Sequence, residues 1–243
     1  WQTHLANVPV YYEFRDNNVD LSSTAATAAI KFQYAQNFKN IFDLYLNNST
    51  IVPAMTGSKT VDDSMTEFAL GKAAMVQNGN WGYGQIAGVQ GNTVNPADVR
   101  FIPIYTGMPG EETQGLCIGS ENFVCINKNA SAADQQASLD FLNWLYTSPE
   151  GKAHVGKDLG FIVPFDTFTD AEKPTDPLGV QVMASSANTA VQNIPWNFTV
   201  FPSQQFKDDF GANLLLYAQG QMTWNAVRDA MIAGWAAEKA AAN

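Results

Sequence analysis

Apolar side chains recur every three or four positions in several stretches of the chain, and this spacing predicts helices. The longest stretch follows the serines at 22–23, either of which can serve as N-cap, and it runs to Tyr45. Shorter helices are predicted from Asp62 to Gly71, from Ser131 to Tyr146, from Ser148 to Gly156, and at 178–189, 204–218 and 225–239. In the helix 131–146 we expect Ala137, Phe141 and Leu145 to face inward.

Short apolar runs predict strands at 73–77 and at 99–105. The second run contains Pro103, which is typical of an edge strand or a crossing between lobes. Two further short strands are expected on either side of the Ser-Glu-Asn turn at 120–122. Residues 1–18 are crowded with aromatic side chains, and we expect them to form an irregular segment that packs on the folded part.

The segment 78–84 (Asn-Gly-Asn-Trp-Gly-Tyr-Gly) combines aromatic, amide and glycine residues in a way that indicates a binding loop. Its glycines leave Trp81 and Tyr83 without bulky local neighbours, so their rings can be offered to a ligand. Asn78 and Asn80 add uncharged donors and acceptors. Flat aromatic faces beside neutral amides suit a sugar. The alternative is a turn whose tryptophan caps the core.

The surroundings of this loop resemble a known family. Phe68-x-x-Gly71-Lys-Ala-Ala-Met75 followed by Asn78-Gly-x-Trp81 resembles the sugar-loop signature of family 1 extracellular solute-binding proteins, which serve carbohydrate ABC transporters. Two later stretches are similar to family segments in the same order: 141–151, ending in Thr-Ser-Pro-Glu-Gly, and 158–164, Asp-Leu-Gly-Phe-Ile-Val-Pro. The resemblance extends from about Asp20 to the C-terminus.

The resemblance implies an α/β fold of the periplasmic-binding-protein type (type II), with two lobes. It implies that this chain supplies most of the C-terminal lobe, at 1–98 and 158–243, and a segment of the N-terminal lobe, at 99–157. Family members are considerably longer, so we expect most of the N-terminal lobe to be missing. The chain opens on Trp1 without a signal-peptide pattern, which suggests that it is processed or trimmed.

The implied function is non-catalytic capture of a sugar or oligosaccharide and its delivery to the permease subunits of an ABC transporter. The implied location is extracellular, either periplasmic or anchored at the cell surface as a lipoprotein. We expect no cofactor and no metal. Which sugar is bound stays open at this point, as does the oligomeric state.

A second group of candidate ligand-binding residues comes from the same resemblance. Trp196 and Asn197 lie in an aromatic segment between two prolines, and the equivalent family segment reaches the cleft. His4, with Trp1, lies in a region that approaches the ligand in the family; the alternative for His4 is a partly buried structural imidazole. Glu121 can accept hydrogen bonds from sugar hydroxyls, or it is a solvated turn residue.

Composition narrows the partners. The formal charge is −10, with 13 lysines and arginines among 243 residues. Nucleic acids and anionic membranes both require clustered cations, so neither is expected as a partner. No apolar run approaches the roughly 20 residues that span a bilayer, and we expect no direct membrane span. Neutral ligands stay allowed.

Enzymatic alternatives have less support in the sequence. A glycosidase needs two carboxylates that face one cleft, whereas Glu111 and Glu112 are adjacent and point apart in an extended chain. Gly115-Leu-Cys117-Ile-Gly119 superficially resembles a nucleophile elbow, and a disulfide from Cys117 to Cys125 is possible. A mononucleotide-binding module would need Gly-x-Gly-x-x-Gly spacing, which the glycines between 79 and 88 lack.

Overall fold

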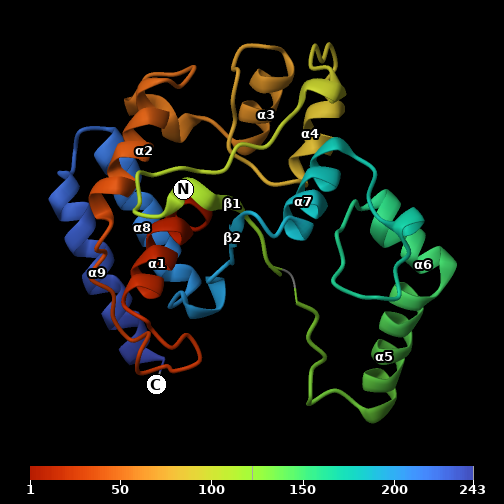
Figure 1. The fold of residues 1–243 in the computed structure, drawn as a ribbon. Coiled ribbons are helices and arrows are strands. Elements are labelled where there is room, and N and C mark those ends of the chain that lie inside the picture. Colours follow the sequence, from red (N-terminus) through yellow and green to blue (C-terminus); the bar gives the residue numbers. More distant parts are fainter. Residues whose placement is uncertain (122, 243) are drawn as a thin grey trace. The chain divides into compact units, whose positions relative to one another are not determined.

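The computed structural model describes residues 1–121 and 123–242, and helices dominate it (Figure 1). The chain forms two units, each assembled from separate stretches. Unit 1 comprises Trp1–Ser64, Ile102–Gly119 and the residues from Ala190 onward, and unit 2 comprises Met65–Phe101 and Ser120–Thr189. The lobe boundaries expected at 98/99 and 157/158 stay a prediction.

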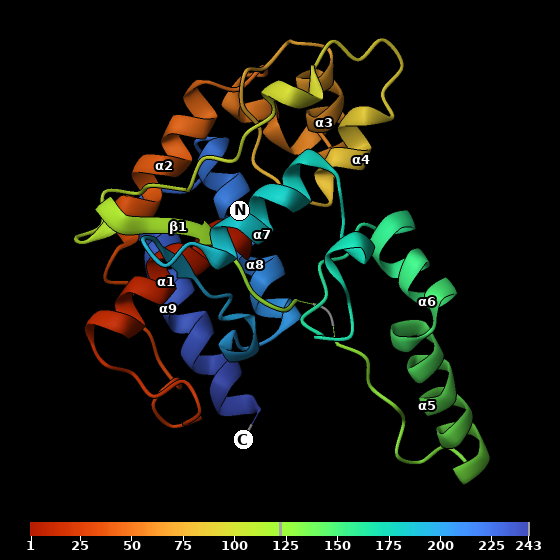
Figure 2. The same ribbon diagram turned by 45° about the vertical axis from the view of Figure 1, so that its right-hand side comes forward.

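Unit 1 contains four long helices and the described sheet. The helices are α1 (His4–Asp16), α2 (Ala35–Asn47), α8 (Gln204–Ala218) and α9 (Trp224–Ala241). Helix α1 lies beside α8 and α9 in both ribbon views (Figures 1 and 2). Strands β1 (Gln114–Cys117) and β2 (Gln192–Ile194) pair in parallel, with an irregular register. Short 3-10 turns lie at Pro53–Ser58, Glu111–Thr113 and Phe198–Val200.

The core of unit 1 is rich in aromatic side chains. Phe38 stacks on Trp224 with ring centroids 5.9 Å apart, and Trp235 packs edge-on against Phe206 at 5.5 Å. The indole Nε1 of Trp235 donates a hydrogen bond to the carbonyl of Thr27 at 2.9 Å, which satisfies its polar atom inside the core. The apolar stripes predicted for 204–218 and 225–239 are therefore confirmed as core faces.

Residues 4–16 are helical, so the prediction of an irregular N-terminal segment was wrong. Every residue from Leu5 to Val10 is buried, and Pro9 lies inside the helix. A helix that is buried on all sides shows no alternation of apolar and polar positions, and an internal proline argues against a helix. Neither the spacing of apolar residues nor the proline therefore indicates this helix from the sequence.

Helix α2 begins at Ala35, about eleven or twelve residues later than predicted from an N-cap at either of the serines at 22–23. The buried carboxylate of Glu13 accepts hydrogen bonds from the backbone N–H groups of Lys31 (2.6 Å) and Gln33 (2.7 Å). Between them Phe32 has a positive φ of 47°. These backbone groups are committed to a side chain from α1, so the segment cannot continue a helix.

Unit 2 consists of one long helix and several short ones, joined by irregular segments. Its helices are α3 (Val61–Ala69, which starts in unit 1), α4 (Gly82–Ala87), α5 (Ala132–Thr147), α6 (Pro149–Ala153) and α7 (Pro177–Ala187). A π-turn at His154–Asp158 continues α6, and 3-10 turns lie at Pro96–Asp98 and Asp170–Glu172. Helix α3 ends as predicted, since Gly71 takes the left-handed conformation with φ 70°.

Predicted helix starts agree with the structure where a serine caps the helix. The side chains of Ser131, Ser148 and Ser203 accept hydrogen bonds from the backbone N–H groups of Asp134, Gly151 and Phe206. These bonds satisfy donors that the first turn of a helix leaves free. The local cap is enough to place the start.

The strands predicted at 73–77, at 99–105 and after residue 122 are irregular backbone in the structure. In the second of these, the carbonyl of Val99 and the N–H of Phe101 bond to the side chain of Gln181 on α7. A side-chain amide thus takes the place of a neighbouring strand. Of the strands flanking the predicted turn only β1 forms, and Asn122 of that turn lies outside the described residues.

Candidate functional site

The binding loop predicted at 78–84 connects the irregular segment 73–77 to α4 in unit 2. Asn78 is committed to shaping this loop. Its Oδ1 accepts from the N–H of Gly79 at 2.9 Å, and its Nδ2 contacts Gln85 Oε1 and Met65 Sδ, both at 3.3 Å. Gly82, the first residue of α4, lies so close that a Cβ there would come within 3.0 Å of Nδ2 of Asn78.

Trp81 is the N-cap residue of α4, and 49% of its surface is exposed. Its ring lies against Gly79, because a Cβ at residue 79 would come within 2.2 Å of the six-membered ring. The six-membered ring therefore occupies the space that a side chain at residue 79 would take. Gly79 thus leaves Trp81 without a bulky side-chain neighbour, as predicted. The exposure of the ring agrees with the prediction.

The support beneath this loop is helical, not the predicted strand. Met65 and Ala69 of α3 and Ile86 of α4 form a buried cluster. Asn80 and Tyr83 are half-buried, and the Asn80 carbonyl accepts from the N–H of Tyr83 at 3.2 Å. The structure thus brings Asn78, Asn80, Trp81 and Tyr83 together in one turn. Glu121, also in unit 2, is half-buried.

His4, Trp196 and Asn197 lie in unit 1, where β2 leads into a second aromatic cluster. The ring of His4 on α1 packs edge-on against Trp196 (centroids 5.3 Å apart) and Phe198 (5.1 Å). Trp196 and Phe198 stack on one another at 4.9 Å with an angle of 15° between their planes. The half-buried indole of Trp196 is thus held on one face by Phe198.

Asn197 is buried, with 4% of its surface exposed, and its backbone N–H donates to Oδ1 of Asn7 at 2.7 Å. Sequence reasoning missed Asn7, which is fully buried on α1. A polar residue three positions after His4 within an otherwise apolar run is the signal that could have found it. Trp1, the other candidate in this region, packs edge-on against Phe42 at 5.0 Å.

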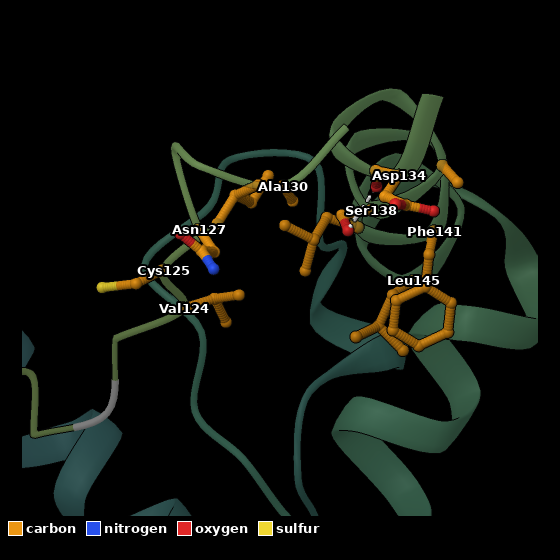
Figure 3. A pocket seen from close by; sticks show the side chains of 11 residues that line it. Val124, Cys125, Asn127, Ala130, Asp134, Ser138, Phe141 and Leu145 are labelled. Carbon is orange, nitrogen blue, oxygen red and sulfur yellow. Dashed lines mark hydrogen bonds between the residues drawn. The ribbon is translucent and has the colours of Figure 1, made fainter. Parts of the chain in front are cut away.

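A separate hollow of about 670 Å³ lies in unit 2 between α5 and the segment 124–130 (Figure 3). Val124 and Asn127 line one side and Phe141 and Leu145 the other. Phe141, which we expected to face inward, is 55% exposed. The stripe on α5 faces this open hollow because none of the described residues packs over it as a closed core. The predicted ligand-binding residues are not among those that line it.

The cysteines are free in the structure, so the disulfide considered from the sequence is absent between these described residues. Burial raises the pKa of the Cys117 thiol to about 12, which keeps it protonated at neutral pH. A protonated thiol is a poor nucleophile, and this argues against the nucleophile-elbow interpretation. Within 1–121 and 123–242, no group of three or more His, Cys, Asp or Glu side chains is placed to hold a metal ion.

Exposed aromatic rings held on fixed supports, beside neutral amides, are typical of binding proteins for small ligands. Comparison with protein families agrees, since residues 11–182 match the family model described as bacterial extracellular solute-binding protein. The match covers more than half of the chain, and the protein belongs to this family. No curated protein matches the chain. No solved structure matches it either.

Membership in the family assigns the protein a solute-binding role in transport and an extracellular or periplasmic location. Proteins of this family bind a ligand and act with transporter partners, and they are generally not enzymes. In the part of the chain that the structure describes, no helix has both the length and the apolar character needed to cross a membrane. A mixed α/β architecture with a small sheet is compatible with the family.

Proposed function

We propose that this protein captures a sugar or oligosaccharide without catalysis and delivers it to the permease of an ABC transporter. In this proposal the fold is the two-lobe type II arrangement, with most of the C-terminal lobe and a segment of the N-terminal lobe in this chain. The location is the periplasm or the cell surface, where a lipid anchor would hold the protein.

The observation that carries the proposal is the presentation of Trp81. Its indole rests on the backbone at Gly79, remains half exposed, and stands in the same turn as Asn80 and Tyr83. A sugar ring has an apolar CH face and a rim of hydroxyl groups. An indole face matches the first, and neutral amide and phenol groups match the second.

The second aromatic cluster supports the same ligand class. Trp196 is held by His4 and Phe198, with the ammonium group of Lys207 6.0 Å from the centroid of the Phe198 ring. Glu121 would add an anionic acceptor for hydroxyl groups. The net charge of −10 disfavours anionic solutes and leaves neutral ones such as sugars.

A ligand panel tests the proposal directly. Glucose, xylose, maltose, cellobiose and raffinose would be titrated into the 243-residue chain by calorimetry and by tryptophan fluorescence, with AMP and citrate as non-sugar controls. We expect saturable binding of at least one sugar and of neither control. Binding of a control with no response to any sugar would contradict the proposal.

A further inference from the structure

Asn7 is a buried polar side chain that no part of the proposed binding role has yet used. It lies on α1, and none of its surface is exposed. Its Oδ1 accepts from the N–H of Asn197 at 2.7 Å, and its Nδ2 donates to the carbonyl of Pro195 at 3.1 Å. One amide thus holds the backbone immediately before and immediately after Trp196.

The chain needs such a bond at this point because strand pairing stops there. Ile118 donates to the carbonyl of Ile194 at 2.9 Å, which is the last bond between the two strand segments before Pro195. Proline has no N–H and cannot extend the ladder. The amide of Asn7 supplies one acceptor and one donor where the neighbouring strand would have supplied them.

Two further contacts limit how Trp196 can sit. A Cβ at Gly119 would come within 3.2 Å of both the backbone nitrogen and Cδ1 of Trp196. The indole of Trp196 therefore has no room to move towards Gly119. His4 lies one helical turn before Asn7 on α1, and its ring packs edge-on against the indole at 5.3 Å. Helix α1 therefore holds the indole through His4 and its backbone through Asn7.

We infer that Asn7 is a positioning residue for ligand binding: by fixing the backbone on both sides of Trp196, it sets the orientation of the indole that meets the ligand. This inference rests on the proposed function. The role requires a neutral amide. Aspartate keeps the acceptor for Asn197 but loses the donor for Pro195, and leucine, of similar volume, loses both.

The test combines a structural readout at Trp196 with an affinity. The chain would be labelled with 5-fluorotryptophan, and the Trp196 signal in the fluorine NMR spectrum identified by its loss in Trp196→Phe. Asn7→Leu and Asn7→Asp are the variants. Val10→Ala is the control, because it removes a buried side chain from the same helix without a hydrogen bond to 195–197.

We expect both Asn7 variants to shift or broaden the Trp196 signal. We also expect them to lower the affinity for the best-binding sugar of the panel about 5- to 20-fold. Val10→Ala should lower Tm while leaving the signal and the affinity unchanged. If Asn7→Leu does not fold, Asn7→Asp, which keeps the size and one bond, carries the test.

The inference is overturned if the folded Asn7 variants keep the parental Trp196 signal, or if they move it while the affinity stays parental. A failure of the proposed function looks different. In that case the parent binds none of the panel sugars, whatever the fluorine signal of the Asn7 variants shows. Parental binding in Trp196→Ala overturns the inference alone, because the indole of Trp196 then does not meet the ligand.

Discussion

At residue 79 a Cβ would come within 2.2 Å of the six-membered ring of Trp81, so any residue larger than glycine would displace the indole from its place. Glycine beside an aromatic residue was interpreted from the sequence as freedom from neighbours. In the structure the ring of Trp81 packs directly against Gly79. A ring that packs against the chain on one side while half of it stays in solvent has less freedom to lose on binding, and such pre-organisation lowers the entropic cost of binding.

Cys117 gives a prediction that depends on pH. Burial raises its thiol pKa from 9.0 to about 12, so the folded state holds the proton more tightly than the unfolded state does. The contribution of this thiol to the free energy of unfolding is fully present below pH 9 and is lost as the pH rises from 9 towards 12. Between pH 8 and pH 10 the free energy of unfolding should therefore fall by about 1.4 kcal/mol because of this thiol.

Urea unfolding at pH 8 and pH 10, in the parent and in Cys117→Ala, measures this effect. The variant should lose less stability over this interval than the parent does, because it lacks the thiol. The buried tyrosines titrate in both proteins, so their contribution cancels in the comparison. Cys125→Ala is the matched control, since its thiol is exposed, and it should behave as the parent. Equal losses in the parent and Cys117→Ala would contradict the assigned cause.

At the scale of elements, Glu13 decides where α2 begins. Its two carboxylate oxygens accept from Lys31 and Gln33, so the segment before Ala35 is held by α1 rather than by its own helical bonds. Glutamine at this position has one acceptor oxygen and would point an NH₂ group at the second backbone donor. We expect Glu13→Gln to destabilise the fold by about 1–3 kcal/mol.

Amide hydrogen exchange shows whether that loss is local. Protection should fall at Lys31 and Gln33 in Glu13→Gln, while Glu112→Gln, at an exposed position, should leave both protection and stability unchanged. Parental protection at these two amides in a stable Glu13→Gln protein would show that the carboxylate does not hold the segment.

Elements with a local signal were predictable, and elements that depend on distant partners were not. Three helices start at a serine, Ser131, Ser148 or Ser203, whose side chain bonds to the backbone three positions further along. Both partners of each bond therefore lie within four consecutive residues of the sequence. The irregular course of 20–34 depends on Glu13 from another helix. The segment 99–101 depends on Gln181, some 80 residues away.

At the scale of the whole molecule, the family could be predicted from ordered motifs, and the match to residues 11–182 confirms a solute-binding protein. The candidate site could be predicted only in part. The exposure of Trp81 agrees with the sequence interpretation, whereas the contact of His4 with Trp196 was not predicted, and ligand binding by these residues stays a prediction. Asn7 could be noticed as a polar residue in an apolar run, but its role could not be assigned, because its partners lie 188 and 190 residues away. The sugar and the transporter stay proposals.

In the function proposed above, the indole of Trp81 stacks on a sugar ring. At a stacking site Trp81→Ala should lower affinity by about 1–3 kcal/mol, a factor of about 5 to 150, with little change in Tm. The indole is half exposed, so its removal costs few folded-state contacts. Trp144→Ala is the matched control, because Trp144 is a tryptophan of similar exposure, 41%, that lies on α5 outside the loop.

Calorimetry with the best-binding sugar, together with thermal unfolding of the parent and both variants, is the most direct measurement. We expect weakened binding in Trp81→Ala alone, at nearly parental Tm. A core-capping tryptophan would instead lose about 3–5 kcal/mol of stability on truncation. A large fall in the stability of Trp81→Ala, with unchanged affinity in the protein that stays folded, would contradict the stacking role.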